Sequence, residues 1–185
     1  MATGIVRIFY GEGHGKSTAA MGRALQAASE GKSVFIIHYL KWRMEEEAQF
    51  MKKLEPEIKV FQFEKTDACY EDLSAEEKKE ASLNIKNGVN FARKVLLTGG
   101  CDLLILDDLG TEFHSQFYQS TIYNIINTRM NRNRPTIIST NLTYDEISHQ
   151  YDERITSRIY TNYNCYQFVG QDVRVLKRQQ QLQHG

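Results

Sequence analysis

The residues best suited to chemistry in this chain are the glycines, lysine and hydroxyl residues of the segment YGEGHGKST at positions 10–18. Glycines let successive backbone N–H groups converge on phosphate oxygens, and a helix that begins there adds the positive end of its dipole. We expect the Lys16 ammonium to contact the outer phosphates and the Ser17 hydroxyl to bind Mg²⁺. Loops of this type usually carry glycine where Tyr10 stands, so the segment is a variant of the motif.

The sequence on either side of this segment favours a phosphate-binding loop. The apolar run IVRIF at 5–9 predicts a preceding strand, and a helical pattern follows from residue 18 to residue 30. The alternative is a glycine-rich turn between a strand and a helix. Because strand, loop, Lys-Ser pair and helix occur in this order, we predict that the chain binds a nucleoside triphosphate. The residues expected to bind it are Gly11, Glu12, Gly13, His14, Gly15, Lys16, Ser17 and Thr18.

A second group of candidate residues is the carboxylate pair Asp107 and Asp108, which ends the apolar run LLIL at 103–106. In phosphate-binding loop proteins we expect a strand of this kind to lie beside the strand that leads into the loop. Asp107 would then bind the magnesium ion, and Asp108 is the candidate base that polarises an attacking water. The alternative is a strand that simply ends in a polar turn.

A third apolar strand, over residues 136–140, is followed by Asn141. Its amide could orient a water near the γ-phosphate, or it could make a turn before the helix expected at 144–149. Arg154 and Arg158 have helical spacing and could contact phosphate across a subunit interface, as an arginine finger does. The alternative is a pair of surface arginines in salt bridges.

Histidines and cysteines give no metal or disulfide pattern. Outside the loop the histidines are His38, His114, His149 and His184, and their spacing matches no metal site. The cysteines are Cys69, Cys101 and Cys165. Because they are odd in number and widely spaced, we expect buried, reduced thiols in a cytoplasmic protein.

Apolar runs alternate with helical patterns along the whole chain. Strands are predicted over residues 5–10, 33–39, 58–63, 103–107, 136–140, 165–169 and 173–176. Helices are predicted over residues 16–30, 45–54, 74–97 and 116–132. Ser74 and Glu77 form a capping box before the third helix, and two glycines at 99–100 end it. Nearly continuous apolar strands separated by helices predict a mainly parallel sheet covered on both faces.

Composition indicates one globular domain. The chain has 185 residues, 41% hydrophobic and 25% charged, with 23 basic and 23 acidic side chains. We expect one domain over residues 1–178 and a polar tail over 179–185. A small basic surplus in residues 113–185 supports only weak attraction to nucleic acid. No apolar run is long enough to cross a bilayer, and the first strand leaves no room for a signal peptide, so a cytoplasmic protein without membrane contact is expected.

Residues of about 1–107 resemble the ATP:corrinoid adenosyltransferases, which attach an adenosyl group to vitamin B12 precursors. The resemblance is carried by YGEGHGKSTAAMGRA at 10–24, Gly31-Lys32, Tyr39-Leu40-Lys41 and GCDLLILD at 100–107. It implies attack of a Co(I) corrinoid on the 5′ carbon of ATP, with the loop holding the released triphosphate and Mg²⁺ offsetting its charge. Aromatic residues that follow the middle strands contact the corrin in some members. Phe61, Phe63 and Tyr70 lie in that region, with core packing as the alternative.

Residues of about 101–178 instead resemble the AAA+ ATPase module of bacterial replicative-helicase loaders and related transposition ATPases. The motifs are DDLGTEF at 107–113, STNL at 139–142, ERITSR at 153–158 and DVR at 172–174. This resemblance implies that Asn141 senses the γ-phosphate, that Arg154 and Arg158 act at subunit interfaces, and that Arg174 contacts nucleotide. It also implies a replicative helicase, single-stranded DNA and further copies of the chain as partners.

The chain therefore resembles a hybrid of two P-loop families that overlap at residues 101–107. We predict a three-layer α/β P-loop NTPase fold with a mainly parallel central sheet. ATP and Mg²⁺ are the expected ligands, and a corrinoid is the expected substrate of adenosyl transfer, which we rank first. An AAA+ ATPase that acts in DNA replication ranks second, and a nucleotide-binding chain with neither activity ranks third.

Overall fold

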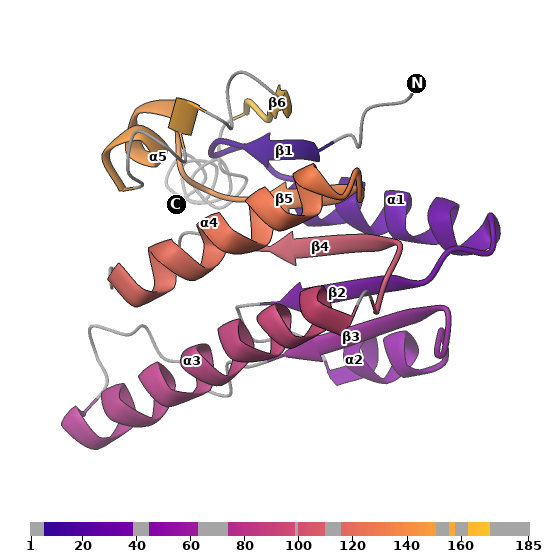
Figure 1. The fold of residues 1–185 in the computed structure, drawn as a ribbon, viewed down its shortest axis with the longest axis horizontal. Helices are drawn as coiled ribbons and strands as arrows, with labels where there is room; N and C mark the ends of the chain where they lie inside the picture. The colour runs from indigo at the N-terminus through magenta and orange to yellow at the C-terminus, as the bar shows by residue number, and fades with distance from the viewer. Residues whose placement is uncertain are drawn as a thin grey trace, which may run out of the picture.

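The computed structural model describes residues 6–38, 45–62, 74–98, 100–109, 116–150, 156–157 and 163–170 (Figure 1). The described strands are β1 (Val6–Tyr10), β2 (Val34–His38), β3 (Ile58–Gln62), β4 (Leu103–Asp107), β5 (Thr136–Ser139) and β6 (Tyr163–Gln167). The described helices are α1 (Lys16–Ser29), α2 (Glu45–Lys52), α3 (Ala75–Thr98), α4 (Gln116–Asn131) and α5 (Tyr144–Gln150). Among the described residues, no helix is both long and apolar enough to cross a membrane.

The strands form one six-stranded sheet in the order β3-β2-β4-β5-β1-β6, and every neighbouring pair is parallel. This confirms the predicted parallel sheet but corrects one expectation. The strand that ends in Asp107 does not lie beside β1, because β5 pairs with both β1 and β4. All four residues of β5 are buried, so this short apolar strand suits the interior of a sheet. The end of β5 thus lies between the glycine loop and Asp107.

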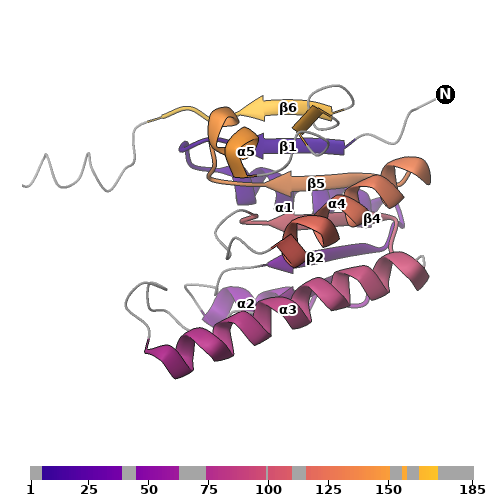
Figure 2. The same ribbon diagram turned by 60° about the vertical axis from the view of Figure 1, so that its left-hand side comes forward.

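Helices cover both faces of the sheet (Figures 1 and 2). On one face α1 presents buried alanines at helical spacing, Ala20, Ala24 and Ala27, which pack with sheet residues such as Ile105. Small side chains let this helix approach the strands closely. The other face, which includes Leu104, packs against α3, α4 and α5. Because neighbouring side chains of β4 point to opposite faces, one apolar strand supplies both cores, and the predicted three-layer fold is confirmed.

Local sequence signals for the elements are largely confirmed. Ser74 N–H donates to Glu77 Oε2 at 2.9 Å, and Glu77 N–H donates to Ser74 Oγ at 3.3 Å. A second capping box, between Thr143 and Glu146, starts α5 in the same way. The strand expected at 165–169 begins at Tyr163 instead. The strand expected at 173–176 lies outside the described residues.

The amino-terminal ends of β4 and β5 are joined by the buried guanidinium of Arg129. It donates to Thr136 Oγ1 at 2.8 Å, to Pro135 O at 2.7 Å and to Asp102 O at 3.0 Å. Its Nη1 also contacts the Cys101 thiol at 3.5 Å, and burial raises the pKa of that thiol. Cys101 is thus a buried, structural thiol, as expected.

The expectation of buried thiols is wrong for Cys165, which is exposed on β6. The cause is position, because β6 lies at the edge of the sheet and only Tyr163 of its residues is buried. Cys69 lies outside the described residues.

We predict that Leu104→Ala lowers the free energy of unfolding by about 2–5 kcal/mol, because Leu104 is 0% exposed and truncation leaves a cavity in the central strand. Urea denaturation followed by circular dichroism measures the change. The matched control is Leu25→Ala on α1, where the side chain is 47% exposed and the expected change is within about 0.5 kcal/mol. Equal losses in the two variants would contradict the assignment of the core.

Candidate phosphate and metal site

The glycine loop between β1 and α1 turns through two residues in the left-handed region. Gly11 has φ of 98° and Gly15 has φ of 96°. A side chain at either position would be strained, since only glycine adopts such angles freely. Gly15 directly precedes Lys16, so the turn delivers the lysine as the first residue of α1.

The Lys16 ammonium lies inside this loop. Its Nζ donates to Gly11 O and Gly13 O, each at 2.6 Å, and the residue is only 6% exposed. Burial lowers the pKa of Lys16, while the negative charges of Asp108 and Asp107 oppose that shift. The two carboxylates thus help to keep a positive charge at the position where the sequence predicts contact with phosphate.

Two neighbouring segments contact the loop from outside. Gly13 N–H donates to Phe168 O at 3.0 Å, and Gly11 N–H donates to Leu142 O at 3.1 Å. A Cβ added at Gly13 would lie 2.6 Å from the Phe168 carbonyl carbon. Gly13 is therefore required by the close approach of another backbone, in addition to any role with phosphate. The sequence places Phe168 in the strand expected at 165–169 but does not predict its contact with the loop, because the pairing of β6 with β1 is not encoded locally.

At the end of β4 the buried Asp107 carboxylate accepts hydrogen bonds from two neighbouring strands. Its Oδ2 lies 3.0 Å from His38 Nδ1, and its Oδ1 accepts from the Ser139 hydroxyl. Burial alone would raise the pKa of Asp107. Hydrogen bonds from His38, Ser139 and Ser17, together with the charge of His38, bring that pKa below its ordinary value. Asp107 is thus held as a carboxylate beside the hydroxyl of Ser17.

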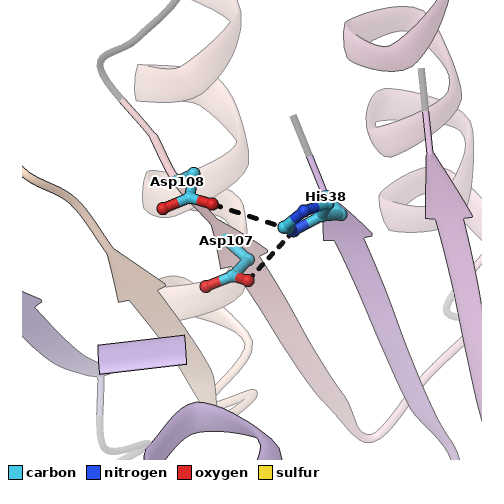
Figure 3. A group of neighbouring side chains, drawn as sticks. All are labelled: His38, Asp107 and Asp108. Atoms are coloured by element: carbon cyan, nitrogen blue, oxygen red, sulfur yellow. Dashed lines mark hydrogen bonds and ion pairs between the residues drawn. The ribbon is translucent and has the colours of Figure 1, made fainter. Parts of the chain in front are cut away.

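Asp108, the residue after β4, adds a second carboxylate at this edge of the sheet. It has φ of 58°, a left-handed conformation that aspartate tolerates better than most residues. Its N–H donates to Ser139 Oγ at 3.0 Å, and its Oδ2 lies 4.0 Å from His38 Nδ1. Figure 3 shows the imidazole pointing toward both carboxylates.

The donor groups at this edge of the sheet suit a divalent cation. His38, Asp107 and Asp108 each offer one ligand atom, and these atoms lie within 4.8 Å of one another. Carboxylate and hydroxyl oxygens are the ligands that Mg²⁺ prefers, and Ser17 and Asp107 provide them in contact with each other. The residues present therefore fit the predicted magnesium ion.

Sequence reasoning missed His38 and Ser139, which the sheet brings to Asp107. His38 has no ligand spacing along the chain, but β2 pairs with β4 and aligns His38 with Asp107. Ser139 ends the strand on the other side of β4. One signal in the sequence could have identified them: His38, Asp107 and Ser139 each end an apolar run. Because the carboxyl ends of parallel strands lie at the same edge of a sheet, these three side chains could have been expected to lie close together.

The remaining predicted site residues lie in the loop, beside it or outside the described residues. Asn141 is exposed and is placed beside the loop by its neighbours, because Thr140 N–H donates to Phe9 O and Leu142 O accepts from Gly11. The exposed loop residues are Glu12, His14, Gly15, Ser17 and Thr18. The arginines Arg154, Arg158 and Arg174 lie outside the described residues.

Of the three aromatic residues considered for corrin contact, Phe61 packs between other rings. Its centroid lies 4.2 Å from that of Phe91 and 5.4 Å from that of Phe35. These contacts favour the alternative of core packing. Phe63 and Tyr70 lie outside the described residues.

Comparison with solved structures finds proteins with a similar fold. A replication initiator DnaA bound to AMPPCP and single-stranded DNA matches 92% of this chain and 42% of its own, with TM-score 0.54 and 18% identity. The AMPPCP-bound DnaA from Aquifex aeolicus matches 90% and 40% (TM-score 0.51, 17% identity). The DnaC helicase loader matches 90% and 80% (TM-score 0.51, 18% identity). At such identities the likeness shows the fold alone: the α/β fold of P-loop AAA+ domains.

Comparison with sequences identifies the family. The model of ATP:corrinoid adenosyltransferase BtuR/CobO/CobP matches residues 2–158. The corrinoid adenosyltransferases of Escherichia coli K12 and Escherichia coli O6:H1 are each 31% identical over 106 residues, which is 57% of this chain and 52% of each relative. The chain belongs to the ATP:corrinoid adenosyltransferase family, and it spans about half the length of the curated relatives it matches.

We predict that Gly13→Ala lowers the free energy of unfolding by roughly 1–3 kcal/mol, because its Cβ would collide with backbone at Phe168 and Val169. The matched control is Gly22→Ala within α1, where a Cβ meets nothing within 4 Å and helix propensity should raise stability by about 0.5–1 kcal/mol. Thermal denaturation without nucleotide measures both changes. An unchanged Tm for Gly13→Ala would contradict the close contact between the loop and the backbone of Phe168 and Val169.

Proposed function

We propose that the chain transfers the adenosyl group of ATP to a reduced, Co(I) corrinoid. The observation that carries this proposal is the juxtaposition of Lys16, Ser17 and Asp107 at one edge of the sheet, in a chain of this family. A loop that surrounds an ammonium, next to a buried carboxylate, is suited to hold a polyphosphate with its divalent cation.

In the proposed reaction the cobalt attacks the 5′ carbon of ATP. A Co–C bond forms, the C–O bond to the triphosphate breaks, and triphosphate leaves with the electron pair while cobalt is formally oxidised from Co(I) to Co(III). Negative charge grows on the oxygen that leaves the carbon. Donors placed around a leaving anion stabilise the transition state more than the ground state. Lys16, buried inside the loop with its Nζ on two loop carbonyls, is the side chain that would provide this stabilisation.

Ser17 and Asp107 would hold Mg²⁺, which offsets triphosphate charge when bound. Asp107 is suited to this role because its pKa is lowered, so it is negatively charged at neutral pH. The Ser17 hydroxyl lies at the first turn of α1, where the helix dipole also favours an anion. In this proposal these residues bind and orient the leaving group, and the corrinoid supplies the nucleophile.

One observation favours a second candidate, an AAA+ ATPase of the helicase-loader type. Because β5 lies between β1 and β4, Asn141 follows β5 beside the loop. In that case Asp108 would polarise a water and Asn141 would orient it toward the γ-phosphate. Arg158 would then act catalytically from a neighbouring copy, Arg154 and Arg174 would contact nucleotide, and a helicase and single-stranded DNA would be partners. A chain that only binds nucleotide is the third candidate.

Product analysis distinguishes these candidates. We predict that ATP, Mg²⁺ and a chemically reduced corrinoid yield triphosphate and an adenosylated corrinoid, detected by chromatography and the visible spectrum. Lys16→Ala should lower kcat/KM by roughly 10²–10³-fold, because a donor to the leaving group is lost.

Lys32→Ala is the matched control, because Lys32 is exposed beyond α1 and pairs with Glu30, so activity should be unchanged. Orthophosphate release without corrinoid, lost in Asn141→Ala, would support the ATPase instead. ATP binding by calorimetry with neither product would leave the third candidate.

A further inference from the structure

We propose that His38 is a positioning residue, which fixes the orientation of the Asp107 carboxylate and thereby strengthens Mg²⁺-dependent binding of ATP. This inference rests on the proposed function only in assuming that the loop binds ATP with Mg²⁺. It requires neither the corrinoid nor the transfer step. His38 is not among the residues that carry the resemblance to either family.

The geometry around Asp107 leaves its carboxylate little freedom. Ser139, at the end of β5, donates to Oδ1, and His38, at the end of β2, binds Oδ2 at 3.0 Å. A carboxylate rotates easily about its terminal bond, but donors on opposite oxygens remove that freedom. All three residues are buried, and their strands pair in one sheet, so the backbone positions are also fixed.

The distances indicate that His38 orients the Asp107 carboxylate and does not itself bind the metal ion. Nδ1 lies 3.0 Å from Asp107 and 4.0 Å from Asp108, so the hydrogen bond is made to Asp107. A proton on Nδ1 is needed for that bond and excludes the same nitrogen as a metal ligand. His38 therefore has the place of an outer partner that orients a ligating carboxylate.

The nearby ammonium explains why such a restraint matters. Lys16 interacts electrostatically with both Asp107 and Asp108. A carboxylate free to rotate beside this positive charge would be drawn to it, and the ammonium would then be less available to phosphate. With His38 and Ser139 in place, Asp107 is directed toward Ser17. The restraint keeps the cation site and the phosphate site separate.

The test compares three substitutions at His38 with calorimetry of ATP binding, in Mg²⁺ and in EDTA, without any corrinoid. Asn places an N–H donor near the position of Nδ1, Gln places its amide farther out, and Ala removes the donor. We expect His38→Ala and His38→Gln to reduce the affinity gained from Mg²⁺ by about 10-fold. His38→Asn should stay within about threefold of the unsubstituted chain, and the affinity in EDTA should be the same for all.

His149→Ala, at an exposed histidine of α5, is the control and should leave both affinities unchanged. If His38→Ala does not fold, the comparison of Asn with Gln still decides. An unchanged Mg²⁺ gain in His38→Gln, or an equal loss in His38→Asn, would overturn the proposal, the latter indicating direct ligation. Absence of adenosyl transfer with a normal Mg²⁺ gain would overturn the proposed function alone.

Discussion

The buried carboxylate of Asp107 is the constraint on which the rest of the site depends. A charge at that depth is costly unless donors compensate it, and burial alone would favour its protonated form. The compensation comes from His38 on one neighbouring strand, Ser139 on the other, and Ser17 on the loop. Strands β2, β4 and β5 must therefore end at the same level, and the loop must follow the next strand along the sheet.

The sequence predicts the elements well because their signals are local. Apolar runs locate the strands, and the capping box before α3 has the hydrogen bonds expected of it. The order of the strands is not local. β5 pairs with both β1 and β4. An apolar run predicts that a strand is buried but does not say which strands are its neighbours in the sheet. His38 was missed for the same reason, since it is 69 residues from its partner Asp107.

The glycines of the loop show why a motif can have two physical causes. Phosphate binding predicts glycine because backbone N–H groups must approach oxygens. The structure adds a separate reason, because Gly13 allows the backbone at Phe168 to approach and hydrogen-bond it. Either cause alone would select glycine at this position. Glycine at this position is therefore also explained by the packing of the loop against the backbone that follows β6.

The chain belongs to the adenosyltransferase family and has a fold similar to that of replication ATPases, and the two reactions proposed from these likenesses share one requirement. Both the adenosyl transfer and the ATP hydrolysis proposed for this chain need a triphosphate held beside a carboxylate, and in either proposal Lys16, Ser17 and Asp107 would hold it. The reactions differ in the atom attacked, carbon in one case and phosphorus in the other. A shared fold with AAA+ domains therefore does not compete with membership of the adenosyltransferase family.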